Sequence, residues 1–239
     1  MVKLLLGRKD VKSDKPDNNG RTPLCWAARN GHEGVVKILL KRDDIDPNRP
    51  GEYGKAPLYC AVENGHEGVV KILLERDDID PNRSGESDKT PLYHAVENGH
   101  EGIVKTLLER NDVSPDKPNN GQTPLWCAAQ NGHEGVVKIL LERDDVSPDK
   151  PDNYGQTPLR RAAQNGHEGV LKILLEQDDV SPDKPDNYGQ TPLWCAAQNS
   201  VRNGLGALAA PRGNCQEDWT GPDDNFYSVP SWDILGLQV

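Results

Sequence analysis

A segment of about 34 residues recurs along most of this chain, and this period constrains the fold more than any other feature. Each copy contains Thr-Pro-Leu, then Gly-His-Glu-Gly, then an apolar run such as Val-Val-Lys-Ile-Leu-Leu, and ends in a stretch rich in Asp, Pro and Gly. The first element begins at Thr22, Ala56 (in place of Thr), Thr90, Thr123, Thr157 and Thr191, and the second at Gly31, Gly65, Gly99, Gly132 and Gly166. Such a short unit cannot bury its apolar face alone, so neighbouring copies must stack into a solenoid.

Each copy predicts two short helices. Thr22 suits the N-cap of the first helix, and Pro23 suits the first helical position, where its missing N–H is no loss. Asn30 and Gly31 tolerate the left-handed conformation that ends a helix. A second helix is expected from about residue 33 to about residue 41, because its apolar side chains form a wide stripe. The Pro- and Gly-rich stretch that closes each copy predicts an extended hairpin arm.

A period of this length also fits tetratricopeptide arrays. In those arrays two longer helices fill nearly the whole repeat. Here roughly a third of each copy is loop, and neither helix exceeds about three turns. The tetratricopeptide interpretation therefore fails.

The run Gly-Gln-Thr-Pro-Leu-Trp-Cys-Ala-Ala-Gln-Asn-Gly-His-Glu-Gly-Val-Val, residues 121–137, resembles the ankyrin repeat. The resemblance extends from Val2 to Asn199 and implies an all-α repeat solenoid, in which each unit is a helix-turn-helix followed by a hairpin loop. It divides the chain into a partial repeat at 1–16, repeats at 17–50, 51–84, 85–118, 119–151 and 152–185, a partial repeat at 186–199, and a non-repeat tail at 200–239 that we expect to be disordered.

One position departs from the family pattern in every unit. Ankyrin repeats carry His directly after Thr-Pro-Leu and use it for hydrogen bonds to the backbone. This chain places other residues there: Cys25, Tyr59, Tyr93, Trp126, Arg160 and Trp194. The resemblance therefore leaves the local rigidity of each unit open.

Composition excludes several classes of function. A net charge of −10 disfavours nucleic acid and anionic membrane as partners, because both need clustered Lys and Arg. The apolar runs are far too short to span a bilayer, and the apolar stretch after Met1 is too short for a secretory signal. Five cysteines without such a signal predict free thiols rather than a disulfide framework. We therefore expect a cytoplasmic protein, with the nucleus left open.

Residue groups that resemble catalytic sites recur from unit to unit, which favours a structural role. His32-Glu33 resembles the start of a zinc-protease helix, but Val36 stands where the second His would be needed. Cys60 and His66 could form a nucleophile and base, yet the same positions recur in other units. We therefore expect no enzyme activity, no metal, no cofactor and no small-molecule substrate.

Recognition of a protein partner is then the expected function. Differences between units concentrate at the hairpin tips and on one side of the first helix, positions that line the concave groove in the ankyrin family. Tyr, Trp and Arg are the side chains that most often carry interface energy. The predicted contacts are Tyr53, Lys55, Trp126, Gln130, Tyr154, Gln156, Arg160, Tyr188, Gln190 and Trp194.

Two interpretations of this set stay open. The aromatic residues after Thr-Pro-Leu could contact the partner, or they could fill the space left by the missing His. Arg160 and Arg161 are interpreted as a contact for an acidic side chain of the partner. We expect a monomer that binds a protein on its concave face. The alternatives are a targeting or regulatory fragment of a larger protein or enzyme complex, and a truncated product without function.

Overall fold

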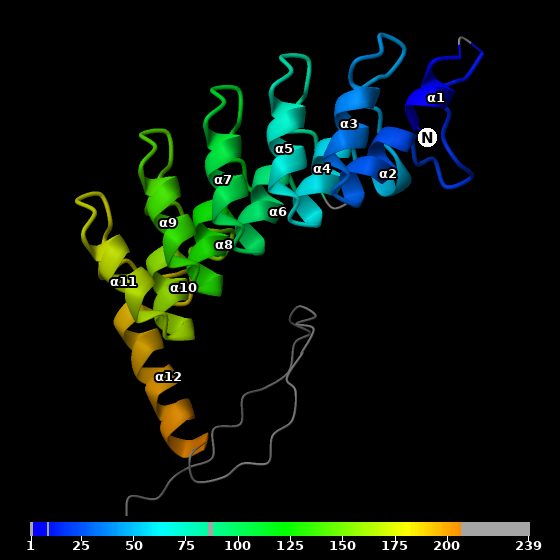
Figure 1. Ribbon diagram of the computed structural model, residues 1–239. Coiled ribbons are helices and arrows are strands. Elements are labelled where there is room, and N and C mark those ends of the chain that lie inside the picture. Colours follow the sequence, from blue (N-terminus) through cyan, green and yellow to red (C-terminus); the bar gives the residue numbers. More distant parts are fainter. Residues whose placement is uncertain (1, 9, 86–87, 207–239) are drawn as a thin grey trace, which may run out of the picture.

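A computed structural model describes residues 2–8, 10–85 and 88–206, with side chains described as far as Asn199 (Figure 1). After α1 (Val2–Leu6), five helix pairs follow in order. They are α2 (Pro23–Arg29) with α3 (Glu33–Leu39), α4 (Pro57–Glu63) with α5 (Glu67–Leu74), α6 (Pro91–Glu97) with α7 (Glu101–Leu108), α8 (Pro124–Asn131) with α9 (Glu134–Leu141), and α10 (Pro158–Asn165) with α11 (Glu168–Leu175). A 3-10 turn, η1 (Glu52–Gly54), precedes α4, and α12 (Pro192–Gly206) ends the described part.

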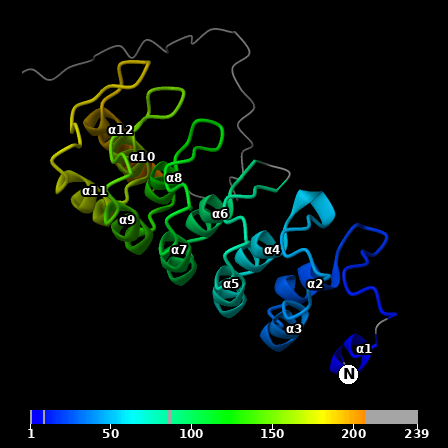
Figure 2. The same ribbon diagram turned by 90° about the horizontal axis from the view of Figure 1, so that it is seen from above.

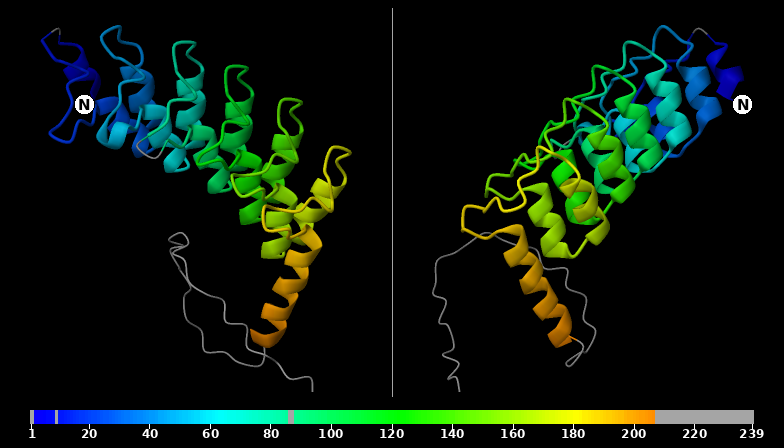
Figure 3. Two further views of the ribbon diagram at one scale, coloured as in Figure 1. Left: turned by 180° about the vertical axis from the view of Figure 1, so that it is seen from behind. Right: turned by 90° about the vertical axis from the view of Figure 1, so that its left-hand side faces the viewer.

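The pairs stack side by side into a curved array. The first helices α2, α4, α6, α8, α10 and α12 form one row, and the second helices form a parallel row behind them (Figures 1 and 2). The hairpin loops project on the side of the first-helix row, so three layers are visible from above and from the side (Figures 2 and 3). Each first helix contacts the first helices of the adjacent units and the second helix of its own. The predicted all-α repeat solenoid is confirmed.

The first helices begin as the sequence predicts. The hydroxyl of Thr22 accepts a hydrogen bond from the backbone N–H of Cys25 at 3.1 Å, and Thr90, Thr123 and Thr157 cap their helices in the same way. Ala56 offers no side-chain cap, which leaves one N–H of α4 without this partner. Each first helix carries Pro at its start, where no N–H is needed.

The glycine of Gly-His-Glu-Gly ends each first helix in the left-handed conformation, and the His that follows reaches back to the preceding unit. Gly132 has φ 73°, and the ring of His167 from the next unit covers it. Nε2 of His167 lies 2.9 Å from the carbonyl oxygen of Gln130, and His66 and His133 make the same contact with their preceding units. The motif therefore joins units as well as ending a helix.

The apolar interior runs through all of the stacked units. The leucine at the same position of each second helix is at most 2% exposed, as Leu39, Leu73, Leu107, Leu140 and Leu174. The leucine of Thr-Pro-Leu is equally buried in five units, from Leu24 to Leu159, but Leu193 of α12 is 74% exposed. Burial of this kind contributes about 1.5–3 kcal/mol per leucine, and each unit obtains it from its neighbours. The second helices end one or two residues before the predicted end near residue 41, as α3 does at Leu39.

An arginine after each of the second helices α3, α5, α7 and α9 links it to the preceding unit. Nη1 of Arg76 donates to the carbonyl oxygen of Leu40 at 2.8 Å, and Arg42, Arg110 and Arg143 do the same in their units. These contacts satisfy carbonyl groups that a helix end leaves free. Each arginine is also paired with the aspartate two residues later, which lowers the pKa of Asp78. In the last pair Gln177 bonds to Ile173 of its own helix instead.

The hairpin arms are loops rather than strands in the part of the chain that the structure describes. Their one ladder contact is the antiparallel bridge between Asn119 and Gln122, so the predicted hairpin arms lack regular strand pairing. Side chains hold the turns instead. Oδ1 of Asp152 accepts hydrogen bonds at 2.9 Å from the backbone N–H groups of Tyr154 and Gln156. Pro and Asp thus favour compact turns over pairing between strands.

The last described helix is longer than the sequence predicts. Similarity to the repeat ends at residue 199, and the prediction places a disordered tail at 200–239. α12 instead continues without a break to Gly206 and packs against α10. The tail prediction is therefore wrong for residues 200–206, and its remainder lies outside the described residues.

Candidate functional site

The residue directly after Thr-Pro-Leu points into the stack and contacts the base of the next hairpin. Cys25, Tyr59, Tyr93 and Arg160 are each 3% exposed, and Trp126 is 1% exposed. Four of them contact the Lys or Gln that directly precedes the Thr-Pro-Leu of the next unit, through either the side chain or the backbone carbonyl group of that residue. The contacts are Cys25 with Lys55, Tyr93 with Gln122, Trp126 with Gln156, and Arg160 with Gln190.

Trp126 shows how this position replaces the His of the family. Its indole Nε1–H donates to the carbonyl oxygen of Gln156 at 3.0 Å, while the ring lies inside the core. The Gln156 carbonyl is therefore satisfied by a side chain of the preceding unit. Trp126 therefore lies in the interior of the stack, which favours the alternative that its ring fills the space left by the missing His.

Arg160 is buried together with its counter-ion. Nη2 of Arg160 lies 2.7 Å from Oδ2 of Asp186, with the two side chains 4% and 0% exposed. The same nitrogen donates to Oε1 of Gln190 at 2.9 Å, and Nη1 donates to Gln164. The other Asp186 oxygen accepts from the backbone N–H groups of Tyr188 and Gln190. Arg160 therefore neutralises a carboxylate of its own chain, which corrects its interpretation as a free contact for an acidic partner.

Arg161 also contacts the preceding unit. Its guanidinium lies 4.6 Å from the centroid of the Trp126 ring and donates to Gln130 at 2.6 Å and to Gln164 at 2.7 Å. Burial and the charge of Arg160 lower the pKa of Arg161. Gln130 is thus half-buried as an acceptor for Arg161 in the structure described.

Among the residues whose side chains the structure describes, five aromatic side chains are exposed, and all belong to first helices or hairpin tips. Tyr188 is 65% exposed, Tyr53 59%, Trp194 46%, Tyr154 45% and Trp26 43%. Tyr53, Tyr154 and Tyr188 share the hairpin-tip position of three different units, whereas Trp194 lies on α12 and Trp26 on α2. The array brings the three tyrosines onto one side because the hairpins all project in the same direction (Figure 2).

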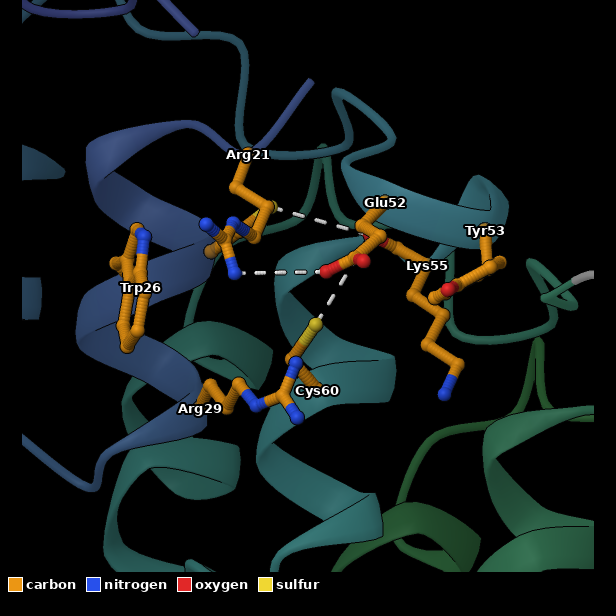
Figure 4. Close-up of a pocket in the computed structure, with 8 residues that line it drawn as sticks. Arg21, Trp26, Arg29, Glu52, Tyr53, Lys55 and Cys60 are labelled. Carbon is orange, nitrogen blue, oxygen red and sulfur yellow. Dashed lines mark hydrogen bonds and ion pairs between the residues drawn. The ribbon is translucent and has the colours of Figure 1, made fainter. Parts of the chain in front are cut away.

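Figure 4 shows a small pocket at the N-terminal end of this side, between α2 and the turn before α4. Arg21 lies 4.8 Å from the centroid of the Trp26 ring and forms ion pairs with Asp17 and Glu52. Nζ of Lys55 lies 5.9 Å from the Tyr53 ring centroid. Cations beside aromatic faces combine positive charge with apolar contact area. This pocket therefore suits a partner side chain that carries negative charge next to apolar surface.

The middle units carry a row of charges on the same side. Lys55 pairs with Glu63 at 2.6 Å and Lys89 with Glu97 at 2.9 Å, so the predicted contact Lys55 is already partnered. His94 lies 3.9 Å from Glu63 and 4.0 Å from Glu97, and its ring packs against Tyr59 at 5.4 Å. These polar side chains lie between the hairpin tip that carries Tyr53 and the hairpin tips that carry Tyr154 and Tyr188.

The structure therefore divides the ten predicted contacts into two groups. Tyr53, Tyr154, Tyr188 and Trp194 are exposed where a partner can reach them. The other six bond within the chain: Trp126 and Arg160 from the interior, and Lys55, Gln130, Gln156 and Gln190 from half-buried positions. Sequence reasoning gave less weight to Trp26 and Arg21, although an exposed Trp beside an Arg is a typical interface signal.

Among the described residues, no group of three His, Cys, Asp or Glu side chains could hold a metal ion. Within the same residues, none of the helices has the length and apolar character that crossing a bilayer requires.

Comparison with known proteins agrees with this architecture. No curated protein matches the chain. A family model described as ankyrin repeats (3 copies) matches residues 1–85, 78–152 and 145–216. These matches cover nearly all of the stacked units, so the chain belongs to the ankyrin-repeat family.

Proposed function

We propose that this protein binds a partner protein across the side formed by its hairpin tips and first helices. Ankyrin repeats generally act as protein–protein interaction modules. The observation that carries the proposal is the distribution of aromatic residues. Among the described residues, Tyr59, Tyr93 and Trp126 are buried, whereas Tyr53, Tyr154 and Tyr188 are exposed at the tips of hairpins that all project on the same side.

Exposed aromatic side chains leave apolar surface in contact with water, and a group of them on one side of a protein often marks a binding surface. Tyr and Trp provide large contact areas while losing little rotamer freedom. The hairpin tips are also held rigidly, since Asp152 and Asp186 each accept two backbone hydrogen bonds below Tyr154 and Tyr188. A partner therefore meets prearranged tyrosines, which lowers the ordering cost of association.

The chemistry of the partner follows from what surrounds the aromatic residues. At the N-terminal end, Arg29 is exposed and makes no side-chain ion pair among the described residues, and Arg21 and Trp26 lie beside it (Figure 4). An acidic side chain next to an apolar one fits this end.

A matched set of variants tests the proposal. In the tip variant, Tyr154 and Tyr188 are replaced by Ala and Tyr53 by Asn, since Tyr53 has φ 57° and Asn tolerates this conformation. The control replaces the exposed lysines Lys105 and Lys138 on the second helices by Ala. We expect a partner captured by the wild type to bind the tip variant at least about thirtyfold more weakly, because interface hot spots contribute about 2 kcal/mol or more.

The control variant should bind as the wild type does. Circular dichroism of each variant checks that the array is folded. The proposal is wrong if every protein captured by the wild type binds the folded tip variant with unchanged affinity, or if the lysine variant alone loses the partner.

A further inference from the structure

Two cysteine thiols from successive units meet at one carbonyl group. Sγ of Cys25, on α2, lies 3.9 Å from the carbonyl oxygen of Lys55, and Sγ of Cys60, on α4, lies 4.0 Å from the same oxygen. Cys25 also approaches the carbonyl oxygen of Arg49 at 3.7 Å. Both cysteines line the pocket of Figure 4, so two buried sulfur atoms share one small space beneath its opening.

The two thiols differ in acidity because they interact. A hydrogen bond with Cys60 lowers the pKa of Cys25. The same contact, together with burial, raises the pKa of the Cys60 thiol. Arg21 and Arg29, which line the same pocket, place positive charge near the anion. These contacts favour the thiolate form of Cys25, which is the form that reacts with oxidants.

The repeat supplies two natural comparisons for this pair. Cys60, Cys127 and Cys195 occupy the same position in three units, but the residue facing them from the preceding unit is Cys25, Tyr93 or Arg160. Cys127 and Cys195 are free and buried, and burial raises the pKa of Cys127 to about 11. Among the described residues, a second thiol is therefore present opposite Cys60 and absent opposite the other two.

We propose that Cys25 and Cys60 form a peroxide-sensitive dithiol that closes into a disulfide between the first two complete units. The Cys25 thiolate attacks one oxygen of hydrogen peroxide, breaks the O–O bond and becomes a sulfenic acid, while hydroxide leaves and takes up a proton. The sulfur of Cys60 then attacks the sulfenic sulfur, forms the S–S bond and releases water. Overall two thiols lose two hydrogens, and one peroxide becomes two molecules of water.

The disulfide would change the pocket in two ways. It would join α2 to α4 covalently and close about one repeat of chain into a loop, which stabilises a fold by restricting its unfolded state. It would also remove the thiolate from the floor of the pocket that Trp26 and Tyr53 line. The inference does not depend on partner binding, because it concerns only groups of this chain.

The test uses the full chain with Cys215→Ser, so that the cysteine outside the described residues cannot react. After treatment with hydrogen peroxide, the protein is digested without reduction and its peptides are analysed by mass spectrometry. We expect a peptide linked through Cys25 and Cys60 that dithiothreitol separates, while Cys127 and Cys195 stay alkylatable after denaturation. Absence of the linked peptide, or equal oxidation of Cys127 and Cys195, would overturn the proposal.

Single variants separate the roles of the two thiols. With Cys60→Ser, Cys25 should stop at the sulfenic acid, which dimedone traps, and the rise in melting temperature on oxidation should disappear. With Cys25→Ser, Cys60 should react no faster than Cys127. Tyr93→Cys places a thiol opposite Cys127 and should create a second linked pair. If Cys60→Ser leaves the oxidation product of Cys25 unchanged, the pairing is wrong.

Discussion

Replacing Asp186 by Ala is expected to lower the free energy of unfolding by about 3–5 kcal/mol, because it leaves the charge of Arg160 buried without its partner. The two side chains are 0% and 4% exposed, so water cannot take over the role of the carboxylate. The variant also loses the acceptor for the backbone N–H groups of Tyr188 and Gln190. Urea unfolding followed by circular dichroism measures the change.

The preceding unit provides the control for this prediction. Asp152 holds its hairpin turn through the same two backbone hydrogen bonds, but the residue that corresponds to Arg160 is Trp126. Asp152→Ala should therefore cost only about 1–2 kcal/mol, the value of the turn. Arg160→Trp leaves the Asp186 carboxylate buried without its cation, so it should also lower the free energy of unfolding by about 3–5 kcal/mol. Equal losses for Asp186→Ala and Asp152→Ala would show that the ion pair contributes nothing.

Trp126→Ala is expected to destabilise the fold by about 3–5 kcal/mol, the range for removing a large buried aromatic side chain. The ring is 1% exposed, carries Arg161 on one face, and donates a hydrogen bond to Gln156. Its loss leaves a cavity between two units and removes one of the two hydrogen bonds to the Gln156 carbonyl oxygen, which also accepts from the backbone N–H of Asp152 at 3.1 Å. The free energy of unfolding in urea is again the measurement.

Trp194 is the matched control, because it occupies the same position in the last unit and is 46% exposed. Trp194→Ala should change stability by less than about 1 kcal/mol. Trp126→Tyr should fall between the two, since Tyr93 holds this position in the preceding unit. A loss for Trp194→Ala as large as that for Trp126→Ala would contradict the inward position of Trp126.

The period of the sequence was enough to predict the helix pairs, their caps and the shared leucine interior, because these depend on local patterns that recur. The contacts between units were harder to predict. His167 and Arg76 each bond to a carbonyl group of the preceding unit, and a backbone acceptor leaves no trace in the sequence. Recurrence showed that these residues matter to every unit, but it did not show what they contact.

The sequence does not predict the interior position of Arg160, because a charged side chain is expected to face water. The residue types found directly after Thr-Pro-Leu do indicate an inward position. Its occupants here are Cys, Tyr, Trp and Arg, and the family uses His. All of these side chains can donate a hydrogen bond, which indicates a fixed acceptor in the next hairpin. The helical continuation through residues 200–206 had no repeat pattern to reveal it.

Each unit of the array is stabilised mainly by its immediate neighbours. Amide hydrogen exchange along the native chain can test this dependence, since it reports the stability of each helix separately. Stacking predicts the slowest exchange in the middle units, α6 to α9, and progressively faster exchange toward α2 and α12. A single common rate for all helices, or slowest exchange at one end of the array, would contradict it.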